Sequence, residues 1–168
     1  MSNQTDALLK EFREESLPTR RVLERIPAEH LGWKPHPTSA ALGTLAMHVA
    51  TIPRQFANLL QLEEVDVTAE MDSPQAPAEV ADILSALQQS QVAFEDWIVG
   101  TNQETFNRDW RLCLGPKVLI SRPRVEIVRT AIFNHRCHHR GQLTVYLRML
   151  GVSVPAIYGP SRDENPFQ

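Results

Sequence analysis

Three of the six histidines of this 168-residue chain lie within five positions, in the stretch NHRCHHRGQL at residues 134–143. Neutral imidazole nitrogens bind transition metals, and histidines at positions i and i+4 of a helix can reach the same ion. His135 and His139 have this spacing. The stretch therefore leaves two alternatives: two ligands of a metal site, or two buried histidines that are satisfied by hydrogen bonds.

The direction of each ring depends on the helix that carries it. Apolar residues recur at helical spacing from about Arg124 to Leu150 and predict one long helix. On this helix His135 and His139 fall in the middle of the apolar stripe, about 40° apart. His138 falls at the edge of the stripe and Cys137 on the polar side. We therefore expect neither His138 nor Cys137 to bind a metal.

A third ligand is expected on another helix. Helical periodicity predicts a helix from Thr38 or Ser39, whose hydroxyls could cap its first turn, to about Leu62. His48 is central on its apolar face. Two helices of a bundle that both turn histidines inward offer three nitrogen ligands around one point. Because Pro53 has no N–H group, this helix should bend or admit a water molecule just past His48.

Two amides could support such a site. Gln142 shares the face of His135 and His139, and Gln55 shares the face of His48. Each could hydrogen-bond a bound water or a ligand, and each could equally be a packing amide. No Asp or Glu falls on either face near the histidines, which argues against a metalloprotease-like glutamate base.

Other groups lie outside this pattern. Tyr158 and Arg162, in the tail after the last helix, are weak candidates to close over the site, and His30 and His36 in a proline-rich loop should be solvated. An arginine face of the last helix points away from the histidines. It could pack on the first helix or across a dimer interface, remain solvated, or bind nucleic acid; it comprises Arg129, Arg136, Arg140 and Arg148.

The remaining periodicity predicts an all-α, antiparallel four-helix bundle. The other two helices should span about Thr5–Ile26, with a kink or break at Pro18, and about Ala78–Val99. A short β-hairpin is expected before the last helix, with strands at residues 110–114 and 118–120. We expect one domain over residues 1–168, with Gly151 ending the last helix.

Composition narrows the class of protein. The net charge of −3 argues against a nucleic-acid binder, and the hydrophobic content of 42% is ordinary for a globular chain. Cys113 and Cys137 form no disulfide framework. We expect a cytoplasmic protein with no nucleic-acid or membrane partner, because neither a signal peptide nor an apolar run of membrane-spanning length is present.

The segment HRCHHRGQLTVYLRMLGVSVPAIYG, together with the lone histidine in LGTLAMHVA, resembles the DinB family of DinB/YfiT-like metalloenzymes. The resemblance covers nearly the whole chain. It implies an up-down-down-up four-helix bundle, a homodimer and a divalent metal held by three histidines. Carried over position by position, the ligands are His48, His135 and His139. Related proteins include S-transferases and isomerases that use low-molecular-weight thiols.

Two functions of different kinds follow. Three histidines with an open position are typical of catalytic metal sites, so the preferred hypothesis is a hydrolase or thiol S-transferase acting on a small molecule. One divalent ion per chain is expected, with zinc or nickel ahead of iron, because nitrogen ligands suit all three. The alternative is a non-catalytic metal-binding or interaction protein related to damage or stress.

Overall fold

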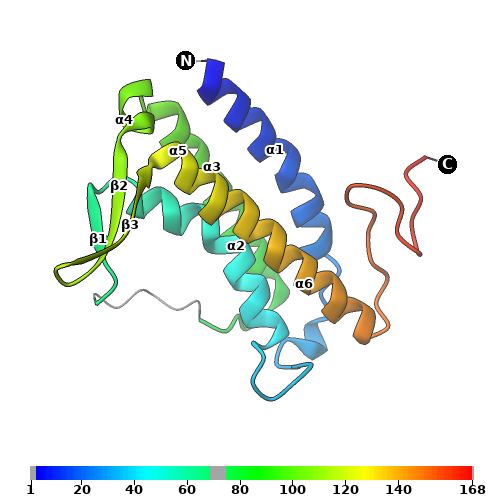
Figure 1. Cartoon of the computed structure of the whole chain (residues 1–168). Coiled ribbons are helices and arrows are strands. Elements are labelled where there is room, and N and C mark those ends of the chain that lie inside the picture. The colour runs from blue at the N-terminus through cyan, green and yellow to red at the C-terminus, as the bar shows by residue number, and fades with distance from the viewer. Residues whose placement is uncertain (1–2, 69–74, 168) are drawn as a thin grey trace.

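The computed structural model describes residues 3–68 and 75–167, and it is mostly helical, with a small sheet at one end (Figure 1). Among the described residues, no helix combines the length and the apolar character needed to cross a membrane. The long segments are α1 (Asn3–Leu23), α2 (Leu42–Leu59), α3 (Val80–Gly100) and a last helix made of α5 (Arg124–Ile127), a π-helical segment (Val128–Asn134) and α6 (His135–Met149). α1 and α2 each pack against both α3 and the last helix.

The apolar faces of these helices form a core in two parts. Near the sheet, the Phe12 ring meets the Phe94 ring edge-on, with centroids 4.4 Å apart. The other part lies toward the opposite end of the helices and contains buried side chains of α1, α2, α3 and α6. It includes Leu23, Val49, Leu87, Leu143 and Leu147.

The sheet has the strand order β1-β2-β3. β2 (Asp109–Leu114) and β3 (Lys117–Pro123) are antiparallel, which confirms the predicted hairpin, and Gly115 at its turn has a φ of 53° that suits glycine. β1 (Glu64–Asp66) adds a parallel strand to β2, which the sequence did not predict because three residues carry no periodicity. A short helix, α4 (Gln103–Asn107), and a 3₁₀ turn (Ala28–His30) were not predicted either.

Of the kink or break expected at Pro18, the break is wrong, because α1 continues through this residue. Proline inside a helix costs about 3 kcal/mol. Here the helix is anchored on both sides of the proline, since Phe12 and Val22 are each fully buried in the core. Tertiary packing therefore outweighs the local penalty.

The expected capping of α2 by Thr38 or Ser39 is also wrong. α2 begins at Leu42, and the first N–H groups of the helix are satisfied by main-chain carbonyls of the preceding loop. Leu42 N donates to Trp33 O at 2.9 Å, and Gly43 N donates to Leu31 O at 2.8 Å. The folded-back loop thus replaces the side-chain cap.

Pro53 perturbs α2 one turn after His48 without ending the helix. The next N–H group, that of Arg54, donates to Ser90 Oγ of α3 at 2.9 Å. Ser90 is fully buried. A hydroxyl of the neighbouring helix therefore accepts this N–H group and joins α2 to α3 beside the histidine-bearing turn. The bend or bound water expected at Pro53 stays a prediction.

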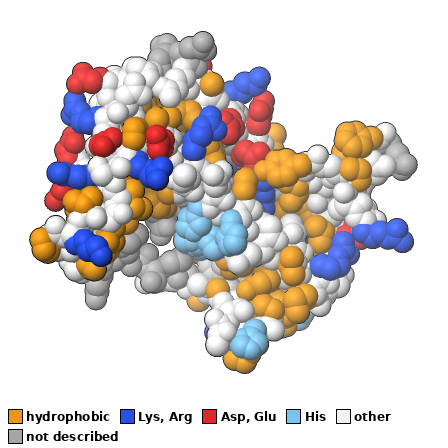
Figure 2. Space-filling view, in the orientation of Figure 1, with side chains coloured by type: hydrophobic (Ala, Val, Ile, Leu, Met, Phe, Trp, Pro, Cys, Tyr) orange, Lys and Arg blue, Asp and Glu red, His pale blue; other side chains and the backbone are white. Residues whose placement is uncertain are grey.

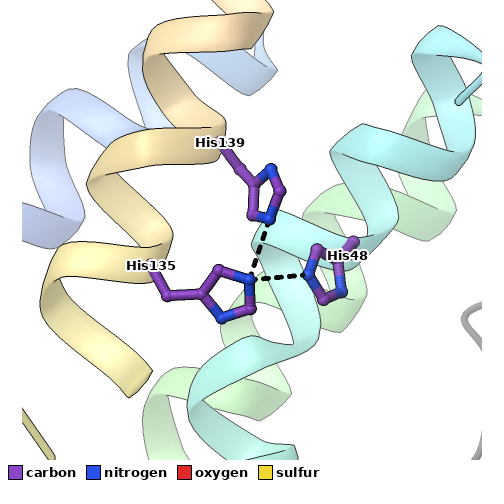
Figure 3. A group of neighbouring side chains, drawn as sticks. All are labelled: His48, His135 and His139. Carbon is purple, nitrogen blue, oxygen red and sulfur yellow. Dashed lines mark hydrogen bonds between the residues drawn. The ribbon is translucent and has the colours of Figure 1, made fainter. Parts of the chain in front are cut away.

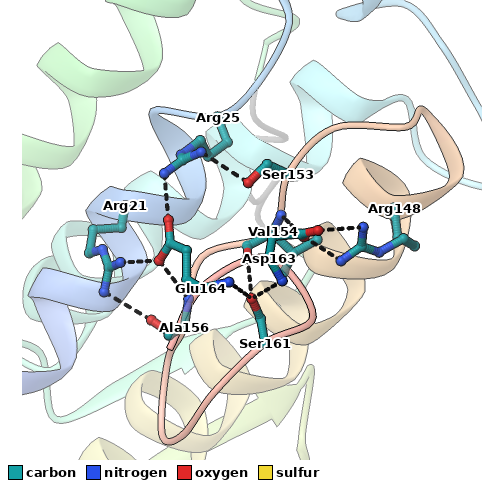
Figure 4. Close-up of polar contacts among 9 residues, drawn as sticks. All are labelled: Arg21, Arg25, Arg148, Ser153, Val154, Ala156, Ser161, Asp163 and Glu164. Atoms are coloured by element: carbon teal, nitrogen blue, oxygen red, sulfur yellow. Dashed lines mark hydrogen bonds and ion pairs between the residues drawn. The ribbon is translucent and has the colours of Figure 1, made fainter. Parts of the chain in front are cut away.

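Gly151 ends the last helix as predicted, with a φ of 73°. The tail beyond it folds back over the ends of α1 and α6 through two carboxylates (Figure 4). Glu164 pairs with Arg21 of α1 and with Arg25 just beyond its end, and Asp163 pairs with Arg148 of α6. These charges tie the tail to both helices.

Candidate metal centre

Two helices bring three histidines together (Figure 3). His48 projects from α2, His135 and His139 project from α6, and one ligand atom of each ring lies within 4.8 Å of the others. His135 Nε2 is 3.3 Å from His48 Nε2 and 2.8 Å from His139 Nε2. Three nitrogens about 2.0–2.1 Å from a tetrahedral zinc ion would lie about 3.3 Å apart. The rings therefore already approach the spacing of a shared ion.

Gln142 orients the His139 ring. Its Oε1 lies 2.6 Å from His139 Nδ1, and because an amide oxygen only accepts hydrogen bonds, Nδ1 carries the proton. The Nε2 lone pair then faces the other two histidines. Of the two roles left open for Gln142, the structure thus shows a hydrogen bond to one of the three histidines. Gln55 is half-buried on α2 and has no hydrogen bond to these histidines within the described parts of the chain.

A main-chain group orients the His135 ring. The ring hydrogen-bonds the backbone of Ala131, one turn earlier. The π-helical segment leaves this carbonyl available, since the N–H group of His135 donates to Thr130 and Ile132 instead. π-helical turns often occur at functional sites. The sequence could not reveal this contact, because a backbone carbonyl leaves no side-chain signal.

The cluster favours neutral imidazoles. Burial, as the largest cause, and the neighbouring His139 and His135 together lower the pKa of His48 to about 4. Burial also lowers the pKa of His135, with His139 as the second cause. Neutral nitrogens are the metal-binding form, so no proton need leave His48 or His135 at neutral pH.

In the metal-free protein, the free energy of unfolding should therefore decrease as the pH falls from 6.5 to 4. Between the ordinary histidine pKa and the lowered pKa of His48, the unfolded chain binds a proton that the folded chain does not. Thermal unfolding in chelator at several pH values measures this slope. His48→Gln should flatten it, whereas His138→Gln, at an exposed histidine, should not. Equal slopes for wild-type and His48→Gln protein would contradict the expectation.

Replacing Gln142 by alanine should weaken metal binding about 10–100-fold, because partners that orient a metal-bound histidine typically contribute this much. A competition titration with a chromophoric chelator measures the affinity. Gln55→Ala is the matched control and should leave the affinity unchanged. An unchanged affinity in Gln142→Ala would show that the His139 ring needs no such support.

The histidine cluster is open to solvent on one side. All three rings are half-buried, and Figure 2 shows histidine side chains at the surface, in the middle of the face formed by α2 and α6. His138 is exposed beside His139, with ring centroids 4.9 Å apart, and lies outside the cluster as predicted. A molecule from solvent can therefore reach the three nitrogens.

The opposite side of α6 packs on α1. Arg136 and Arg140 are buried there and donate to Ser16 and Glu15, which confirms packing on the first helix as the role of their face. Cys137 lies on the same side, away from the histidines, as predicted. The suggestion that Tyr158 closes over the site is wrong, because its hydroxyl donates to Glu15. Arg162 is exposed in the tail and makes no hydrogen bond to the cluster within the described residues.

The sequence resemblance implies a metal site of three histidines. In the structure His135 and His139 of α6 face His48 of α2, and Gln142 contacts His139. The sequence matches the DinB family over residues 1–166. The chain belongs to the DinB family. This membership covers both helices that carry the histidines.

Individual relatives of this DinB-family chain extend the match. The Bacillus subtilis (strain 168) protein YrdA is 28% identical over 165 residues, which cover 95% of this chain and 90% of YrdA. A DinB-like protein of Bacillus cereus has a similar fold, with a TM-score of 0.74 at 23% identity over 91% of this chain and 97% of that one. YjoA of Bacillus subtilis, also DinB-like, gives a TM-score of 0.69 at 20% identity, over 90% and 97% of the two chains. These structures share the fold of this chain.

Proposed function

We propose that His48, His135 and His139 bind one divalent transition metal per chain, zinc or nickel ahead of iron. We further propose that the protein is a metal-dependent hydrolase or thiol S-transferase acting on a small molecule. The observation that carries the proposal is the convergence of three ring nitrogens within 4.8 Å. The hydrogen bonds that orient His139 and His135 add support, because such partners typically accompany metal-binding histidines.

The donor set fits a catalytic ion. Three neutral imidazoles leave the charge of a divalent ion uncompensated and leave a coordination position open, whereas structural zinc is normally closed by four protein ligands. When bound, such an ion lowers the pKa of a coordinated water or thiol toward neutrality. Gln142 and the Ala131 backbone would keep His139 and His135 in place while the open side admits the substrate.

The absence of carboxylates from the candidate cluster favours a thiol over water as the nucleophile. Among the described residues the cluster consists of histidines alone. A thiol has an ordinary pKa of about 8.5 and bulk water one of about 15.7, so a thiol needs less help to ionise at neutral pH. A low-molecular-weight thiol is therefore the preferred cosubstrate.

Several further properties belong to the same proposal. We infer an up-down-down-up bundle, because in Figure 1 α1 and the last helix run in one direction and α2 and α3 run in the opposite one. A single domain, a homodimer and a cytoplasmic location are proposed on the sequence expectations, and a link to damage or stress belongs to the non-catalytic alternative. The non-catalytic alternative differs in predicting a bound metal with no turnover.

An activity screen separates the two functions. Protein loaded with zinc, nickel or iron is incubated with small thiols and an electrophilic acceptor, and in parallel with a panel of esters. The proposal predicts loss of free thiol, or ester cleavage, that chelator abolishes and His139→Ala lacks. Metal-loaded protein that turns over neither class would support the non-catalytic alternative.

A further inference from the structure

A second polar cluster lies on the side of α6 that faces away from the histidines. Cys137 Sγ is 3.2 Å from Tyr158 Oη, 3.5 Å from Arg140 Nη2 and 3.6 Å from Glu15 Oε2. The thiol is half-buried between α1, α6 and the tail. None of these four side chains takes part in the proposed metal centre.

The partners of Cys137 hold one another in place. Glu15 Oε2 accepts hydrogen bonds from Arg140 Nη2 at 2.9 Å and from Tyr158 Oη at 2.7 Å. Partial burial raises the pKa of Tyr158, and its contacts with Cys137 and Glu15 raise it further, so the phenol stays neutral and can donate. The thiol therefore lies among fixed donors and one carboxylate.

Arg136, the neighbour of Cys137 in sequence, has donors that are not used. Its side chain is 3% exposed, and only Nη2 donates, to Ser16 Oγ at 3.0 Å. Nε and Nη1 are buried without a hydrogen-bond partner within the described parts of the chain. Buried donors without an acceptor are rare because they are costly. The Phe12 ring faces this guanidinium at 5.1 Å, but neither Nε nor Nη1 has a hydrogen-bond acceptor among the described residues.

Cys137 and Arg136 line the same small void. The void is too narrow to admit a water molecule. A free water therefore does not supply the missing acceptor. An oxygen atom covalently bonded to Sγ needs less room than a water molecule, because it lies closer to the sulfur than a water in van der Waals contact can. The other lining residues are Glu15, Phe133 and Arg140.

We propose that Cys137 is a site of oxidation by hydrogen peroxide, and that Arg136 stabilises the resulting sulfenic acid by donating to its oxygen. A sulfur electron pair attacks one peroxide oxygen and the O–O bond breaks. The departing hydroxide takes the thiol proton and leaves as water. Sulfur is thus oxidised by two electrons while the peroxide is reduced.

The second cysteine of the chain serves as an internal comparison for Cys137. Cys113 on β2 is also a free thiol and is 5% exposed. Burial, its first cause, and the charge of Glu64 raise its pKa. Low concentrations of peroxide should therefore convert Cys137 and leave Cys113 reduced.

Trapping with a cyclic 1,3-dione, which reacts with sulfenic acids, tests the proposal. The full-length protein is treated with equimolar hydrogen peroxide in the presence of the dione, and labelled peptides are quantified by mass spectrometry. The expected result is labelling at Cys137 and little at Cys113. Labelling of neither cysteine, or of both equally, would overturn the proposal.

Arg136→Met tests the role of the guanidinium, and Arg129→Met, at an exposed arginine of the same helix, is the matched control. The yield at Cys137 should fall about tenfold in Arg136→Met, since hydrogen bonds that involve charged groups are the strong ones, and stay at the wild-type level in Arg129→Met. Maleimide should label Cys137 equally fast in all three proteins, which separates stabilisation from access. Arg136→Lys replaces Arg136→Met if that variant does not fold. A wild-type yield without Arg136 would overturn the proposal.

A bound metal could also oxidise a nearby thiol, so the trap is repeated in His48→Ala. Labelling at Cys137 should persist in this variant, because Cys137 lies on the other side of α6 from the histidines. Loss of labelling in His48→Ala would assign the oxidation to the metal centre and contradict the proposal.

Discussion

Replacing His135 by alanine should reduce the bound metal from about one ion per chain to less than a tenth of that. Structural zinc sites bind with about 10–16 kcal/mol, which is roughly 2.5–4 kcal/mol for each of four ligands. Loss of one ligand should therefore weaken binding about 10²–10³-fold. His135 is the most sensitive position because its Nε2 lies close to both of the other rings. Elemental analysis after dialysis against a weak chelator measures the metal content.

The control for this prediction, His138, lies in the same stretch of sequence as His135. His48→Ala and His139→Ala should lose the metal as His135→Ala does. His138→Ala should retain it, because the His138 ring is exposed and outside the cluster. Retention of the metal in His135→Ala, or its loss in His138→Ala, would show that the ligands are different residues.

Replacing Arg124 by alanine should lower the free energy of unfolding by about 3–5 kcal/mol, the cost typical of removing one partner of a buried charged interaction. Arg124 is 1% exposed. Its guanidinium donates to main-chain carbonyls just after α2 and at the start of β2. The acceptors are Leu60 O at 2.9 Å, Leu62 O at 2.8 Å, and Arg108 O and Asp109 O at 3.2 Å each.

These contacts join the end of α2 to β2 and to the start of the last helix. The alanine variant removes the side-chain donor of all four carbonyls, of which Arg108 O keeps the Arg124 backbone N–H group. Urea unfolding followed by circular dichroism measures the loss. Arg122→Ala is the matched control: this arginine is exposed, pairs with Glu126 at 3.2 Å, and should change stability by less than about 1 kcal/mol. Similar stabilities of the two variants would contradict the anchoring role of Arg124.

The metal cluster was the most predictable part of this molecule. Helical periodicity places His135 and His139 on one face, and the same rule places His48 on the inward face of α2, so contact between the faces suffices to bring the rings together. The same geometry places Gln142 on the histidine face but left its role there open. The orientation of His135 by the Ala131 backbone could not be predicted, because it depends on a π-helical segment.

The errors also have a common physical cause. The expected break at Pro18 and the expected hydroxyl cap of α2 are local rules, and tertiary contacts override both. Burial of Phe12 and Val22 holds α1 together across the proline, and the carbonyls of Leu31 and Trp33 replace the cap. The importance of Arg124 was missed because its carbonyl partners are distant in sequence.

X-ray absorption at the edge of the bound metal tests the central claim most directly. For zinc, the claim predicts three imidazole nitrogens at about 2.0–2.1 Å and one further light atom. His139→Ala should lose one imidazole contribution. A sulfur ligand at about 2.3 Å, or fewer than three imidazoles in the wild-type protein, would contradict a metal centre built from His48, His135 and His139.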